Sequence, residues 1–169
     1  MRLITAAAAL AVIAMAGCNN GMDQQSATKV MTSALGGTAA AQMHFNKPTN
    51  GGTNASFDGT ITNPAGTGSA HVTGSAVDNN GTWTVNFDIT FSQWTDLASN
   101  VTLNGALHET ASFTTMSPLV GSVKITGDVA ATGSVQGTAD FDLAVNYSPT
   151  QYQVSGHVGG ASLDASVNL

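Results

Sequence analysis

Cationic side chains are scarce in this sequence of 169 residues. Lys and Arg together number four, against ten Asp and Glu, and the formal net charge is −6. A nucleic-acid-binding surface needs clustered cations to neutralise phosphates, so this class of partner is excluded.

The single cysteine, Cys18, excludes a framework of intrachain disulfides. Charged residues make up only 8% of the chain, which is not the highly charged composition of a disordered protein. The length fits one ordinary domain or a small pair.

The first residues have the pattern of a secretion signal. Arg2 supplies a positive charge, and the apolar run of residues 3–16 is too short for a permanent membrane-spanning helix. The run ends in Met15-Ala16-Gly17-Cys18. This tetrapeptide resembles the lipobox of bacterial lipoproteins, in which an apolar residue and two small residues precede a Cys. Leu is the usual residue where this sequence has Met15.

The resemblance implies that the Cys18 thiol receives a diacylglycerol and that residues 1–17 are removed. The new amino group would also be acylated, typically with palmitate. Two or three acyl chains anchor a protein stably, because each buried CH₂ contributes about 0.8 kcal/mol. The resemblance therefore implies an exported protein, held to the membrane through the lipid on Cys18. An ordinary cleaved signal with an incidental Cys is the alternative.

The residue after Cys18 bears on the destination. In the lipoprotein family, an Asp directly after the Cys often retains the protein in the inner membrane. This sequence has Asn19 there. The resemblance therefore favours the outer membrane, and it leaves open whether the domain faces the periplasm or the cell surface.

Residues 18–37 are predicted to form a lipidated tether. Residues 19–27 are polar without periodicity, which is typical of a flexible spacer. A short helix is expected over residues 26–35, capped by Ser26 and ended by Gly36-Gly37. Its apolar face would contain Val30, Met31, Ala34 and Leu35.

Residues 38–169 are predicted to form one all-β domain. Between Trp83 and Phe91 every second residue is apolar, as in a strand with one buried face. Asn80-Gly81 precedes this strand and is the favoured pair for a tight hairpin turn. Similar alternation occurs over residues 39–45, 55–61, 70–76, 101–113, 119–127, 135–147, 152–158 and 161–169.

About nine strands with short connections predict an antiparallel up-and-down meander. Glycines on the apolar face favour strong coiling, so we expect a soluble barrel or half-barrel. A two-sheet β-sandwich is the alternative, since it would bury the same face. An outer-membrane-spanning barrel would turn that face towards lipid. The Ala- and Gly-rich faces and the lipid anchor favour the soluble domain.

Motifs of known enzymes are missing. There is no HExxH zinc motif, no GxSxG nucleophile elbow and no phosphate-binding loop. The sequence therefore predicts no enzyme, no cofactor and no metal site. The histidines fall on the polar faces of predicted strands, where they could form a transition-metal site or be solvated. Because no two of them have the local spacing of metal ligands, we expect solvated side chains. They are His44, His71, His108 and His157. For Asp140 and Asp142, which could bind a cation, we likewise expect solvation.

Glu109 breaks the alternation, because it falls on the apolar register between Leu107 and Ala111. A buried carboxylate there would be costly and could be functional. A bulge after His108, or an exposed strand end, would place it in water instead. We expect the bulge or the strand end.

The first functional hypothesis is a non-enzymatic binding or structural module in the cell envelope, with an unknown protein partner. The alternative is a carrier of a small apolar ligand, in a cavity lined by Phe87, Phe141 and Leu143. Trp94 with Phe91 could form an aromatic lip at the mouth of a barrel. The candidate ligand-binding residues are therefore Phe87, Trp94 and Phe141.

Overall fold

The computed structural model describes residues 21–44, 54–64, 66–116 and 119–168. These residues form one helix, α1 (Gln24–His44), followed by eight strands. The strands are β1 (Asn54–Thr62), β2 (Gly66–Asn79), β3 (Thr82–Asp96), β4 (Val101–Met116), β5 (Leu119–Gly133), β6 (Gly137–Tyr147), β7 (Gln151–Val158) and β8 (Ala161–Asn168). In this part of the chain no helix is both long enough and apolar enough to cross a bilayer.

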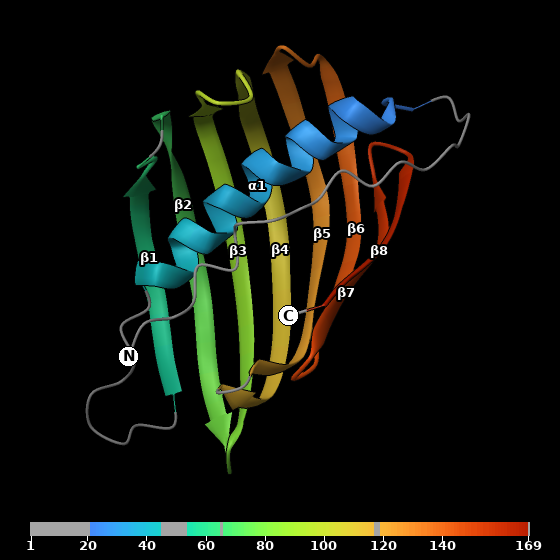
Figure 1. The fold of residues 1–169 in the computed structure, drawn as a ribbon. Coiled ribbons are helices and arrows are strands. Elements are labelled where there is room, and N and C mark those ends of the chain that lie inside the picture. The colour runs from blue at the N-terminus through green and yellow to red at the C-terminus, as the bar shows by residue number, and fades with distance from the viewer. Residues whose placement is uncertain (1–20, 45–53, 65, 117–118, 169) are drawn as a thin grey trace.

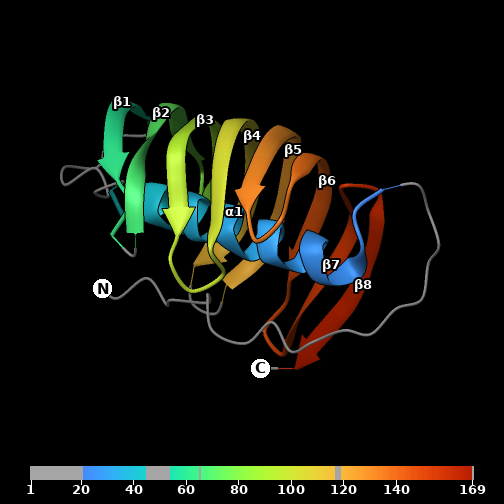
Figure 2. The same ribbon diagram turned by 90° about the horizontal axis from the view of Figure 1, so that it is seen from above.

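The eight strands form one antiparallel sheet in chain order, from β1 at one edge to β8 at the other. This confirms the predicted all-β antiparallel meander. The described residues contain eight strands rather than about nine, and the strands form a single sheet rather than the two sheets of a sandwich. The sheet is strongly curved and remains open between β1 and β8 (Figures 1 and 2).

Helix α1 runs diagonally across the concave face of the sheet (Figure 2). It begins after Asp23, whose Oδ1 accepts a hydrogen bond of 2.8 Å from the backbone N–H of Ser26. Asp23, not Ser26, is therefore the N-cap. The helix buries Ala27, Val30, Met31 and Ala34 against the sheet. Burial of side chains the size of Val30 or Met31 stabilises the fold by roughly 1.5–3 kcal/mol each.

The helix does not end at Gly36-Gly37, and the strand expected over residues 39–45 is helical as far as His44. Helix α1 therefore spans the boundary expected between residues 18–37 and 38–169. The run from Ala39 to Ala41 fits the spacing of apolar residues in a helix as well as that in a strand. Alanine also has the highest helix propensity. Gly37 is buried within the helix and lets α1 approach the rings of Phe91 and Trp94.

The spacer expected over residues 19–27 is also shorter than predicted. The backbone N–H of Met22 donates a hydrogen bond of 2.7 Å to the carbonyl oxygen of Gly159, in the turn between β7 and β8. Helix α1 begins two residues later. The chain is therefore already joined to the domain at Met22.

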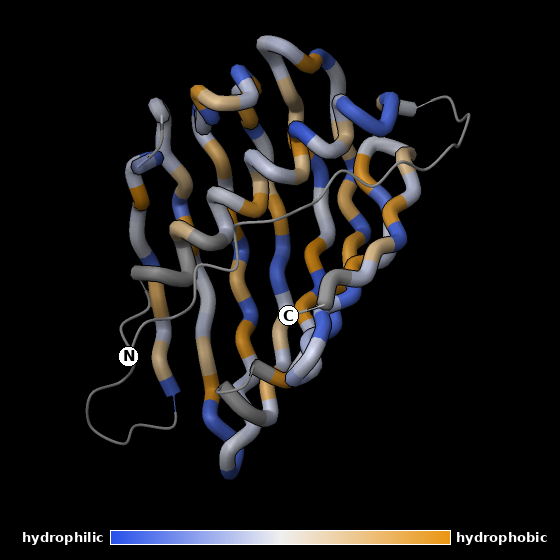
Figure 3. The backbone as a smooth tube through the Cα atoms, in the orientation of Figure 1, coloured by the Kyte–Doolittle hydropathy of each residue, from blue (hydrophilic) through white to orange (hydrophobic). Residues whose placement is uncertain are grey.

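The predicted alternation of the strands is confirmed, and the apolar side chains face the helix. Phe87, Ile89, Leu143 and Val145 are buried on the concave side, and the alternation is visible as orange and blue along the strands (Figure 3). The hairpin at Asn80-Gly81 is also confirmed. Both residues have positive φ, 54° and 91°, as a type I′ turn requires. The Gly81 N–H donates a hydrogen bond to Asp78 Oδ1.

Candidate functional site

Helix α1 covers only part of the concave face. In Figure 1 it lies over the upper half of the sheet, towards the turns that join β3 to β4 and β5 to β6. Side chains further along the strands lie beyond it, and the hydrophobic residues among them are only partly buried. This uncovered part of the concave face is the candidate site.

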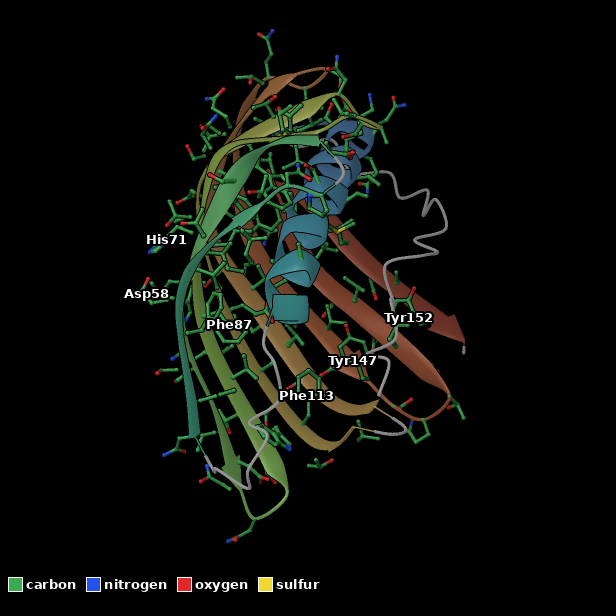
Figure 4. All side chains as sticks on the ribbon, turned by 90° about the vertical axis from the view of Figure 1, so that its left-hand side faces the viewer. Asp58, His71, Phe87, Phe113, Tyr147 and Tyr152 are labelled. Atoms are coloured by element: carbon green, nitrogen blue, oxygen red, sulfur yellow. The ribbon has the colours of Figure 1, made fainter. Side chains whose placement is uncertain are left out.

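A row of aromatic side chains crosses the uncovered part. Adjacent strands place Trp83 opposite Phe113, and Tyr147 opposite Tyr152. Gly121 on β5 lies between Phe113 and Tyr147 in the same row. We call Trp83, Phe113, Tyr147 and Tyr152 the aromatic row. Figure 4 shows Phe113, Tyr147 and Tyr152 on the helix side of the sheet, beyond the end of α1.

Gly121 allows the rings of the aromatic row to meet across β5. The ring centroids of Phe113 and Tyr147 are 6.2 Å apart, and those of Tyr147 and Tyr152 are 6.3 Å apart. A Cβ on Gly121 would lie 2.6 Å from the Phe113 ring, too close for contact without a shift. The rings of Phe113, Tyr147 and Tyr152 are therefore in sequence along the row, and the two tyrosines add phenol hydroxyls to it. Such rings provide large apolar contact area together with hydrogen-bonding groups.

Glu109 is buried near the centre of the concave face. It lies opposite Phe87 on β3 and Ile125 on β5, and the register on both sides is continuous at this position. Only 1% of its surface is exposed. The expected bulge or exposed strand end is therefore wrong. The register shifts of β4 lie elsewhere, opposite residues 91–94 and between residues 113 and 115.

The carboxylate of Glu109 acts electrostatically on the aromatic row. Burial raises the pKa of Tyr147 above its ordinary value of 10.0, because desolvation disfavours the phenolate. The negative charge of Glu109 raises this pKa further, and Tyr152 adds a smaller contribution in the same direction. The site therefore combines an apolar ring surface with a phenol group, that of Tyr147, whose pKa lies above its ordinary value.

The three predicted ligand-binding residues are buried but do not line one shared hollow. Phe87 and Phe141 lie on β3 and β6, with β4 and β5 between them. Trp94 packs beneath α1 with its ring centroid 5.7 Å from that of Phe91, and it is 3% exposed. This is core packing rather than an aromatic lip. Cys18, the predicted lipidation site, lies outside the described residues.

The sequence did not lead to a prediction of Phe113, Tyr147 and Tyr152 as site residues. Tyr147 and Tyr152 flank Ser148-Pro149, a pair of residues that is typical of turns. A tight hairpin there places the two tyrosines opposite each other, as the register shows. The proximity of the two tyrosines could therefore have been predicted. The part of the concave face that α1 leaves uncovered could not, because it depends on how the helix packs on the sheet.

The convex face carries the predicted polar side chains. Three histidines each contact an aspartate of a neighbouring strand: His71 with Asp58 at 3.4 Å, His108 with Asp88 at 2.8 Å and His157 with Asp140 at 2.9 Å. Figure 4 shows Asp58 and His71 pointing outward. Asp142 contacts Lys124 at 3.3 Å. Among the residues whose placement is described, no three metal-ligating side chains cluster. The side chain of His44 lies outside the description.

No protein-family model, no curated protein and no solved structure matches this chain.

Proposed function

We propose that the protein is a lipid-anchored lipoprotein of the bacterial cell envelope, whose β domain is a non-enzymatic binding or structural module. The observation that carries this proposal is the position of the only cysteine. Cys18 ends an apolar segment of signal length, in the lipobox-like pattern Met15-Ala16-Gly17-Cys18. The folded domain follows almost at once, since the backbone of Met22 is already hydrogen-bonded to Gly159.

The concave face supports a module rather than a carrier with an internal cavity. Phe87, Phe141 and Leu143, which were expected to line such a cavity, are each at most 3% exposed. Packed side chains occupy the space that a ligand would need. The charged groups on the convex face also support an anchored domain, because a spanning barrel would turn apolar residues outward there.

Intact-mass analysis of protein purified from bacterial membranes tests the anchor. The expected mass is that of the chain from Cys18 with a diacylglyceryl group and a further acyl chain. Detergent, but not high salt, should extract it. The variant Cys18→Ser should carry no lipid and should not be retained by its anchor. An unmodified Cys18, or release of the native protein by salt alone, would contradict the proposal.

Asn19 provides a matched test of the destination. We propose that the native protein is sorted to the outer membrane, since the residue after Cys18 is not Asp. Separation of the two membranes on a density gradient should place the native protein in the outer-membrane fraction. Asn19→Asp should shift it towards the inner membrane, and Asn19→Gln serves as the control. Equal distribution of the three proteins would refute this sorting step.

A second candidate function is a carrier that holds a small apolar ligand on the aromatic row. The half-buried rings of Phe113, Tyr147 and Tyr152 favour it, because they form an apolar surface that α1 does not cover. The fluorescent probe anilinonaphthalene sulfonate should then bind saturably with one-to-one stoichiometry. Phe113→Ser should weaken that binding, and His71→Ser on the convex face should not. Binding that does not saturate, or that Phe113→Ser leaves unchanged, would exclude the carrier.

A further inference from the structure

The chain enters the domain at one particular end of the sheet. Met22 bonds to Gly159, and its side chain lies against Gly159 and near Gly137 at the start of β6. In an antiparallel meander the turns after β3, β5 and β7 all lie at the same end of the sheet. We call this the turn end, and it consists of residues 97–100, 134–136 and 159–160 together with Gly21 and Met22.

The turn end is one continuous surface. The backbone N–H of Ser134 donates to the carbonyl oxygen of Asn100 at 2.8 Å, and the Ser134 hydroxyl donates to the carbonyl oxygen of Ser99 at 2.7 Å. These bonds join the turn after β3 to the turn after β5. A shallow groove bordered by Met22, Gln136 and Gly159 continues the surface towards the turn after β7.

The distance from Cys18 to this surface is short. Met22 is the fourth residue after Cys18, and an extended chain spans at most about 3.6 Å per residue, so the two are separated by at most roughly 14 Å. This step rests on the proposed lipidation of Cys18. A lipid-bearing Cys18 lies at the bilayer surface, so Met22 and the turn end are held close to the headgroups.

The chemistry of the turn end fits a lipid surface. The turn residues themselves carry no charged side chain, but carboxylates flank them: Asp96 at the end of β3 accepts hydrogen bonds from the backbone N–H of Ala98 and the hydroxyl of Ser99, and Asp140 borders the groove. Leu97 is 66% exposed there, and it is the exposed large hydrophobic residue of the described part of the chain. An exposed apolar side chain at the tip of a turn can enter the headgroup region of a bilayer.

We propose that the turn end is the membrane-contacting surface of the domain, with Leu97 inserted among the lipid headgroups. The strands then rise away from the bilayer. The 15 residues of β3 span roughly 45–50 Å at about 3.3 Å per residue. Trp83 lies near the far end of β3, so the aromatic row is displayed away from the membrane, towards a partner in the aqueous compartment.

An accessibility measurement tests this orientation. A fluorescent amino acid is incorporated at position 97, or at position 150 in the turn between β6 and β7 at the opposite end of the sheet. The lipidated protein is reconstituted into phosphatidylcholine vesicles and titrated with iodide, a water-soluble quencher. The quenching constant should be severalfold lower at position 97 than at position 150.

A second arm separates this inference from the lipidation itself. The chain from Cys18 is coupled through its thiol to a maleimide-bearing lipid in the same vesicles. Protection at position 97 in this arm supports the orientation, even if mass analysis of the native protein shows no lipid and so defeats the proposed function. A long Gly-Ser insertion between Asn20 and Gly21 should reduce the protection. Equal quenching at positions 97 and 150 in the coupled protein would overturn the proposal.

Discussion

Gly37 of α1 lies directly against the ring of Phe91 on β3. A Cβ on Gly37 would overlap Cε1 of Phe91, and it would also approach the Trp94 ring to 3.4 Å. Gly36, the preceding residue, has nothing within 4 Å of the corresponding position. The absence of a side chain at Gly37 therefore sets how closely the helix packs on the sheet, and Gly36 has no such role.

This pair of glycines predicts opposite effects of one substitution. Gly37→Ala should destabilise the protein by about 1–3 kcal/mol, because the ring of Phe91 and the helix must move apart. Gly36→Ala should stabilise it by up to about 1 kcal/mol, because alanine has the higher helix propensity and the position is exposed. Equilibrium unfolding in urea measures both. Similar effects of the two substitutions would show that α1 does not pack on Phe91 as described.

The strands were predictable because each carries its own signal. Alternation from Trp83 to Phe91 and the Asn80-Gly81 turn are local features that require no knowledge of distant residues. The same holds for the order of the strands, since short turns force neighbours in sequence to pair. Closure into a barrel was not predictable in this way, because it depends on pairing between β1 and β8.

The errors arose where packing with distant residues decides the structure. Gly36-Gly37 predicts a helix end from the local sequence. The helix continues instead, and Gly37 packs against Phe91 and Trp94, which lie more than fifty residues later in the chain. Glu109 breaks the alternation, and a bulge was the less costly local explanation. The alternation of β4 by itself places Glu109 on the concave face, where the structure buries it, and packing across that face decides that the carboxyl is accepted there without a bulge.

Asp23 predicts an acid-dependent contribution to stability. Hydrogen bonds from the backbone N–H and then the hydroxyl of Ser26 lower the pKa of Asp23 below its ordinary value of 3.8, and Lys29 contributes weakly. The contribution is therefore present above pH 3.8 and is lost as the pH falls through the folded-state pKa. Asp23→Asn keeps a capping side chain without the titrating group.

The difference in urea midpoint between the native protein and Asp23→Asn should therefore shrink as the pH is lowered. Asp58→Asn on the convex face is the control for a general effect of removing a carboxylate. A difference that stays constant across the acid range would contradict the role of Asp23 as a charged cap.

Tyr147 predicts a loss of stability at alkaline pH. Burial, followed by Glu109 and Tyr152, raises its pKa above 10.0, so the folded protein holds the phenol proton more tightly than the unfolded chain. Its contribution is fully present below pH 10 and is lost as the pH rises through the folded-state pKa. The stability of Tyr147→Phe should fall less steeply in this range, as measured by urea unfolding at a series of pH values. Parallel curves for the two proteins would contradict the burial of the Tyr147 hydroxyl.

The electrostatic coupling between Glu109 and Tyr147 can be measured directly. The chain has two tyrosines, so Tyr152→Phe leaves Tyr147 as the only tyrosine, and ultraviolet absorbance then reports its ionisation alone. Adding Glu109→Gln removes the nearby negative charge and should lower the pKa of Tyr147. The pKa should stay above 10.0, because burial is the larger cause and remains. Asp58→Asn on the convex face should leave the titration unchanged. If Glu109→Gln also leaves it unchanged while the fold is intact, the carboxylate of Glu109 does not act on Tyr147.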